Sequence, residues 1–109
     1  MTQLDIVEMI GDQLTQVDMV IARLAPSDPN AAELTDLRRK LDQQQQQLVK
    51  HAFDDNTAQF QEAAEALKVV NDGIGGSIQK IDQIATTIDG VNRFLASATN
   101  LVTTAAKLV

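Results

Sequence analysis

The last third of the chain carries an unbroken series of apolar residues at alternating steps of three and four. Between Ser77 and Val109 the series consists of Ile81, Ile84, Ile88, Val91, Leu95, Ala98, Val102, Ala105 and Val109. This spacing is typical of a helix that buries one stripe of its surface against other helices. It predicts a long C-terminal helix near residues 77–107 whose apolar stripe lies inside the folded protein.

The size and composition of the chain favour a helical bundle. Its 109 residues suffice for one hydrophobic core, so we predict a single domain, 1–109. Apolar residues make up 44% of the chain but aromatic residues only 3%, so the core must be largely aliphatic. Two prolines and five glycines are too few turn signals for many short strands. We therefore predict an all-α fold, a small antiparallel up-down bundle of four helices with the C-terminal one longest.

The first half of the chain shows two further helical patterns separated by a proline-rich break. The first, near 3–24, has the apolar series Val7, Ile10, Leu14, Val17, Ile21 and Leu24, widened by Ile6 and Val20. Ser27 or Asp28 can cap the second helix, with Pro29 in its first turn, so this helix is predicted near 30–50. It directs Leu34, Leu37, Leu41 and Leu48 inward, and Gln44 occupies the apolar position between the last two.

A phase change near His51 predicts the start of a third helix, near 55–71. The cap-forming residues 54–57 follow the change, which favours a helix end and a new start over the alternative of one long kinked helix. Residues 71–76 contain three glycines and predict a loop, with Ser77 as the N-cap of the fourth helix.

The helical spacing continues through these glycines. Its members are Phe60, Ala63, Leu67, Val70, Ile74, Ser77, Ile81 and Ile84. A loop does not need helical phase, so two interpretations remain open: coincidence, or a single helix over 57–107 in some state of the protein. A phosphate-binding loop is not predicted, because the third glycine, the lysine and the preceding strand of such motifs are all missing.

The charge of the chain argues against nucleic acid as a partner. The net charge is −6, with a balance of −7 over residues 1–72 and +1 over residues 73–109. A nucleic-acid backbone requires a positive field.

The absence of cysteine excludes disulfides and thiolate chemistry. The first residues lack the basic region of a secretory signal, so a cytoplasmic location is expected, with specialised secretion without a cleaved signal left open.

No catalytic, cofactor-binding or metal-binding residue is predicted, and the protein is not expected to be an enzyme. His51 is the only histidine and lacks a partner nucleophile or further ligands, so we expect it in solvent or in a helix cap. Glu62 and Glu65 lack the histidines of a carboxylate-bridged metal site and predict a solvated helix face. The basic residues 38–40 fan around a helix, so we expect them to pair with Asp36, with Asp42 or with an acidic helix.

The clearest functional indication lies on the predicted helix 77–107, on the side outside its apolar stripe. This side has few charges and many small or hydroxylated residues. Three explanations are open: a place in the middle of the bundle, a protein partner or second copy, or a membrane surface. A strand over 101–109 is a further structural alternative. The candidate partner-binding residues are Thr86, Gly90, Ser97, Thr103 and Thr104.

These patterns predict a non-enzymatic interaction module that binds a specific protein, as an adaptor, chaperone or inhibitor does. The bound protein can also be a second copy of the chain, held through the last helix. The alternative is an amphipathic membrane-active or secreted protein whose C-terminal helix engages lipid. Few Lys and Arg residues accompany that helix, which weakens the membrane alternative.

Overall fold

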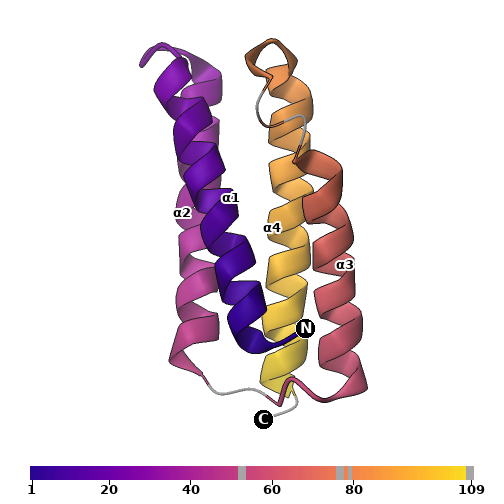
Figure 1. The fold of residues 1–109 in the computed structure, drawn as a ribbon. Helices are drawn as coiled ribbons and strands as arrows, with labels where there is room; N and C mark the ends of the chain where they lie inside the picture. The colour runs from indigo at the N-terminus through magenta and orange to yellow at the C-terminus, as the bar shows by residue number, and fades with distance from the viewer. Residues whose placement is uncertain (52–53, 76–77, 79, 108–109) are drawn as a thin grey trace.

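The computed structural model of the protein describes residues 1–51, 54–75, 78 and 80–107. They form four α-helices and one turn of 3₁₀-helix: α1 Gln3–Arg23, α2 Pro29–Lys50, α3 Ala58–Ile74, η1 Ile81–Gln83 and α4 Ile84–Lys107. The α-helices run alternately up and down, and α1 begins at the same end of the bundle at which α4 ends (Figure 1). The predicted all-α up-down bundle is confirmed, and α4 is the longest of these helices, with 24 residues.

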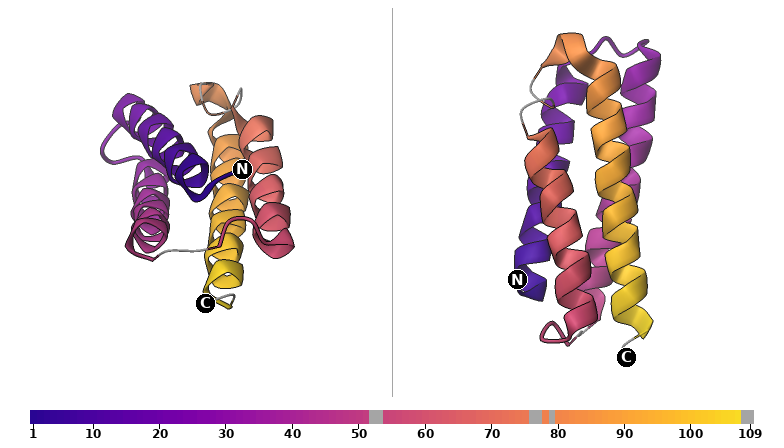
Figure 2. Two further views of the ribbon diagram at one scale, coloured as in Figure 1. Left: turned by 60° about the horizontal axis from the view of Figure 1, so that its bottom comes forward. Right: turned by 90° about the vertical axis from the view of Figure 1, so that its right-hand side faces the viewer.

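The bundle consists of two helical hairpins that pack face to face. α1 packs against α2 and α3 against α4, and the hairpins meet mainly where α2 approaches α4 (Figure 2). α2 and α4 run in the same direction, so this central pair is parallel, whereas the pair within each hairpin is antiparallel. The backbones of α1 and α3 approach each other less closely. α4 is therefore covered by two helices and still has one outward face.

The helix starts follow from capping side chains. The hydroxyl of Thr2 accepts a hydrogen bond from the backbone N–H of Asp5, whose carboxylate in turn accepts one from the N–H of Thr2, which forms a complete capping box. Asp28 caps α2 through the N–H of Asn30, with Pro29 in the first turn, as predicted. The break before α3 is also confirmed, because His51 caps the end of α2.

The start of α3 is later in the chain than predicted. Thr57 is the N-cap and accepts from the N–H of Phe60, so the helix begins at Ala58 instead of near residue 55. Asp54 instead closes a turn before the helix, where its carboxylate accepts from the N–H of Asn56 and its carbonyl from the hydroxyl of Thr57. Such local hydrogen bonds of Asp compete with helix formation.

The predicted loop over 71–76 is wrong in its first half, because α3 continues to Ile74. Ile74 is buried and lies against Gly90 of α4, and this packing outweighs the cost of about 1 kcal/mol for Gly73 inside a helix. α4 begins at Ile84 after η1 instead of at residue 77, and Ser77, the predicted cap, lies outside the described residues. The single helix over 57–107 is not the arrangement seen in this structure. Residues 101–107 are helical, so the strand alternative is wrong for this described part of 101–109.

The core is largely aliphatic, with two phenylalanines at its centre. Leu34, Leu37, Leu41 and Leu48 of α2 are all buried, as predicted, and Phe60 and Phe94 are fully buried. The predicted stripe of α4 is only partly right. Ile88, Val91 and Ala98 are buried, but Ile84, Leu95 and Val102 are half-buried, and Phe94 and Leu101 take the innermost positions instead. The side chains of Ile81, Ala105 and Val109 lie outside the part that the structure describes.

Candidate interaction surface

Three of the five predicted partner-binding residues lie on the side of α4 that meets α3. Gly90, Ser97 and Thr104 are spaced by seven residues and therefore share one side of the helix. Gly90 is buried, and a Cβ atom at this position would lie 2.6 Å from Cγ2 of Ile74. Ser97 and Thr104 are half-buried, and Thr104 borders a shallow recess with Ala63 and Ala66 of α3. Gly90 therefore allows close packing of α3 on α4 within the chain, and its assignment to a partner surface stays a prediction.

The other two predicted residues, Thr86 and Thr103, are exposed and lie on a broader outward surface. We call this surface the α4 outer face and define it by the exposed residues Ala85, Thr86, Asp89, Asn92, Arg93, Ala96, Thr99, Asn100 and Thr103. All have short side chains except Arg93. Its two charged residues, Asp89 and Arg93, form an ion pair of 3.2 Å with each other.

Two polar side chains of the α4 outer face donate hydrogen bonds to the backbone of the helix itself. The hydroxyl of Thr103 donates to the carbonyl of Thr99 at 2.9 Å, and the side-chain amide of Asn92 donates to the carbonyl of Ile88 at 3.1 Å. Because these donor groups already bond to backbone carbonyls, they offer fewer free hydrogen-bond donors to solvent. The α4 outer face is therefore close to neutral in charge and presents mainly methyl groups and small amides.

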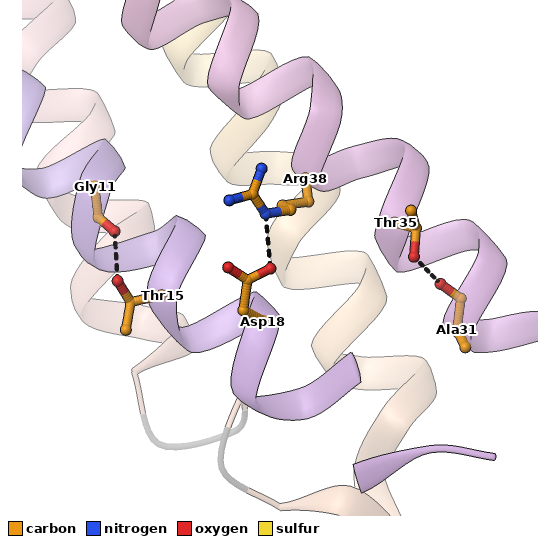
Figure 3. A network of polar contacts seen from close by, with 6 residues as sticks. All are labelled: Gly11, Thr15, Asp18, Ala31, Thr35 and Arg38. Carbon is orange, nitrogen blue, oxygen red and sulfur yellow. Dashed lines mark hydrogen bonds and ion pairs between the residues drawn. The ribbon is translucent and has the colours of Figure 1, made fainter. Parts of the chain in front are cut away.

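Several charged side chains of α1 and α2 instead form ion pairs. Asp18 of α1 and Arg38 of α2 point toward each other across the hairpin, with 2.7 Å between Oδ1 and Nε (Figure 3). Arg39 and Lys40 both pair with Asp36, and the hydrogen bond from Arg39 is the main cause that lowers the pKa of the Asp36 carboxyl. The prediction that residues 38–40 pair with neighbouring acidic residues is confirmed. In the capping box, the backbone hydrogen bond from Thr2 likewise lowers the pKa of Asp5.

The contact between α1 and α3 contains a buried amide that the sequence interpretation missed. Gln13 is fully buried and donates a hydrogen bond from Nε2 to Oδ1 of Asn71. Its Oε1 atom is buried without a hydrogen-bond partner, as is Oε1 of Gln16 one turn later. The series Ile6, Ile10, Gln13, Val17 and Val20 has steps of four and three, so the spacing would have placed Gln13 in the core. Gln44, which occupies an apolar position of the predicted second helix, is only half-buried. Its neighbour Gln45 donates to the carbonyl of Val7, at 3.0 Å.

Replacing Gln13 by Met is expected to raise the free energy of unfolding by about 1 kcal/mol. A buried acceptor without a partner costs about 1–3 kcal/mol, whereas Met fills a similar volume without that cost. Asn71 is half-buried and can exchange its lost bond for water. Urea denaturation followed by circular dichroism measures the change, and a clear loss of stability would show that the amide pair is net stabilising.

The remaining chemically interesting side chains are dispersed. His51 is exposed at the end of α2, and Glu62 and Glu65 are exposed on α3, as predicted for a cap and a solvated face. In the described part of the chain, no three His, Asp or Glu residues gather in a way that would bind a metal ion. None of the described helices combines the length and apolar character needed to cross a lipid bilayer.

Comparison of the chain with protein-family models, with curated proteins and with solved structures gave no match. The four α-helices define the class of the protein as a small four-helix bundle.

Proposed function

We propose that the protein is a non-enzymatic interaction module that binds another protein through the α4 outer face. The observation that carries this proposal is the composition of that face: nine exposed residues along one helix, with a single ion pair and no other charge. Exposed helix faces normally carry Lys and Glu. The exposed residues of α2, in contrast, include Glu33, Arg39, Lys40 and Lys50.

The side chains of the α4 outer face suit a protein interface. Short side chains such as Ala and Thr lose little conformational entropy when a partner covers them. The weak charge removes most of the desolvation cost that an interface with unpaired Lys or Glu would incur. Ala96 lies between the ion pair and Thr103 in the sequence, so a substitution there probes the middle of the face.

Replacing Ala96 by Glu is expected to reduce partner capture at least about tenfold, which corresponds to about 1.4 kcal/mol of binding free energy. A carboxylate in the middle of the contact must be desolvated, and the one cation of this face, Arg93, already pairs with Asp89. The measurement is recovery of specific proteins from native lysate on immobilised protein, quantified by mass spectrometry, followed by the Kd of each recovered protein in isolation.

The matched control is Ala32→Glu, which adds the same side chain at an exposed alanine of α2. It should leave recovery unchanged, and both variants should melt like the unmodified chain. Equal recovery by wild type and Ala96→Glu would argue against binding through this face.

The membrane alternative requires α4 to leave the bundle, because its large apolar side chains Phe94 and Leu101 are fully buried and its outer face has none. Flotation with anionic vesicles tests it. Co-migration with lipid that is lost on deletion of residues 94–109 would favour that alternative over the proposed interaction module.

A further inference from the structure

We infer that two copies of the chain associate through the outer side of the α1–α2 hairpin. Exposed apolar side chains at one end of each hairpin enter an apolar recess at the opposite end of the other copy. We call this surface the hairpin face and define it by Leu4, Gly11, Thr15 and Ala22 of α1 and by Ala31, Thr35, Arg38, Asp42 and Val49 of α2. The inference does not depend on the proposed function, because the hairpin face shares no residue with the α4 outer face.

The first observation is a pair of large apolar side chains in solvent at one end of the hairpin. Leu4 is 65% exposed and Val49 is 68% exposed. α1 begins and α2 ends at this end of the bundle, where the side-chain amide of Gln3 donates to the carbonyls of Leu48 and His51 (Figure 1). Full burial of a Leu or Val side chain contributes about 1.5–3 kcal/mol, so covering this pair favours association.

The second observation is an apolar recess at the opposite end of the hairpin. The connection from α1 to α2 and the flanking turns of both helices form it. Its described lining residues carry no charge and are Ile21, Ala22, Leu24, Pro26, Ala31, Ala32 and Thr35. Aliphatic side chains can cover such a surface without removing water from a charged group.

The third observation is that the exposed side chains and the recess are equally far apart on both helices. Ala22 follows Leu4 by 18 residues, and Ala31 precedes Val49 by 18 residues. This interval is about five helical turns, or about 27 Å, so each pair lies on one side of its helix. A second hairpin turned end for end therefore places Leu4 on Ala22 and Val49 on Ala31 in one arrangement with twofold symmetry.

The middle of the hairpin face allows a second copy to approach closely (Figure 3). The hydroxyl of Thr15 donates to the carbonyl of Gly11 at 3.1 Å, and that of Thr35 donates to the carbonyl of Ala31 at 2.7 Å. Because these hydroxyls bond to their own helix, covering them leaves no hydroxyl donor without a partner. The twofold register also places Thr15 opposite Gly11 of the second copy, so small side chains meet at the centre.

The charged residues of the hairpin face are complementary in the same register. Arg38 and Asp42 are equally far from the midpoint between Ala31 and Val49, so Arg38 of each copy faces Asp42 of the other. Asp18 has Glu8 of the second copy at its level, but it already forms an ion pair of 2.7 Å with Arg38. Opposite charges across an interface fix its register more than its affinity.

The extent of the hairpin face fits a weak dimer. Two helices, each about 10 Å wide, present about 500 Å² per chain over a length of about 27 Å, which gives about 1,000 Å² for two copies. This area is near the lower limit of about 1,000 Å² for a specific interface. We therefore expect a dimer that forms at high protein concentration and dissociates on dilution.

Sedimentation equilibrium over a range of concentrations measures the Kd of this dimer. Val49→Glu should raise that Kd at least about tenfold, because the twofold interface buries the new carboxylate twice. The matched control is Val69→Glu, which changes a valine of α3 that is 64% exposed and lies outside the hairpin face. It should leave the Kd unchanged, and both variants should melt like the unmodified chain.

Disulfide trapping tests the end-for-end register. The chain contains no cysteine, so Leu4→Cys and Ala22→Cys each introduce a single thiol. An oxidised mixture of the two variants should give covalent dimers on a non-reducing denaturing gel. Either variant alone should not, because its two thiols lie about 27 Å apart in the twofold dimer, beyond the reach of a disulfide.

A wild-type chain that stays monomeric up to millimolar concentration would overturn the inference. Equal weakening by Val49→Glu and Val69→Glu would overturn it too, as would covalent dimers that form as readily from one cysteine variant as from the mixture. A dimer that is lost with Ala96→Glu but kept with Val49→Glu would overturn it in favour of self-association through the α4 outer face.

Discussion

Replacing Phe94 by Ala is expected to lower the free energy of unfolding by about 3–5 kcal/mol, the largest effect we expect of a single substitution in this protein. Phe94 is fully buried and is one of the two largest buried side chains among the described residues. Its removal leaves a cavity between α4 and the helices that cover it, and backbone packing from two sides limits how far the cavity can close. Urea denaturation at several temperatures measures the loss.

The matched control is Leu95→Ala, one position further along the helix. The apolar spacing in the sequence favours Leu95 as the core residue, but in the structure it is half-buried. Its replacement should cost only about 1–2 kcal/mol. If Leu95→Ala lowered the free energy of unfolding more than Phe94→Ala, α4 would be rotated about its axis so that Leu95, and not Phe94, faced the core.

The second large effect is expected from Gly90→Leu, which should cost about 2 kcal/mol even though Leu is the better helix former by nearly 1 kcal/mol. A Cβ atom at Gly90 would lie 2.6 Å from Cγ2 of Ile74, a branched side chain with little freedom to move away. α3 and α4 must then separate locally. Thermal unfolding of the single variant measures the loss.

A double-mutant cycle with Ile74→Ala isolates the cause. In that background the Leu side chain can occupy the space vacated by Ile74, so the coupling energy should favour the double variant by at least about 1 kcal/mol. Gly73→Ala is the control for helix propensity, because no heavy atom lies within 4 Å of a Cβ at that position. It should stabilise α3 slightly. Additive effects of Gly90→Leu and Ile74→Ala would contradict close packing at this point.

The parts of the fold that could be predicted are those with local physical causes. α1 and α2 were predicted to within one residue at each end, because capping side chains, Pro29 and regular apolar spacing act over a few residues. The pairing of Arg39 and Lys40 was predictable for the same reason, because both lie about one helical turn from Asp36. Arg38 instead pairs with Asp18 of α1, which only the packing of α1 on α2 brings close.

The end of α3 and the candidate surface depend on contacts between distant segments. Asn71, Asp72 and Gly73 are residue types that favour loops, yet they are helical because Ile74 packs against Gly90, sixteen positions along the chain. The small residues of α4 predicted one interaction face, but in the structure they form two groups. One group, which contains Gly90, packs against α3, and the other, which contains Thr86 and Thr103, is exposed. The residue types are alike in both sets, so composition could not separate them.

The sequence by itself determined that this chain forms four helices, where α1 and α2 start and end, and that α4 is apolar over a wide arc. These features follow from hydrogen bonding and side-chain spacing within each helix. Only the tertiary structure decided which column of α4 lies innermost. Thr87, Phe94 and Leu101 form one column and Ile88, Leu95 and Val102 the next, and both are mainly apolar. The positions of α2 and α3 around the helix bury the first column more deeply, and spacing along one helix carries no information about where its neighbours lie.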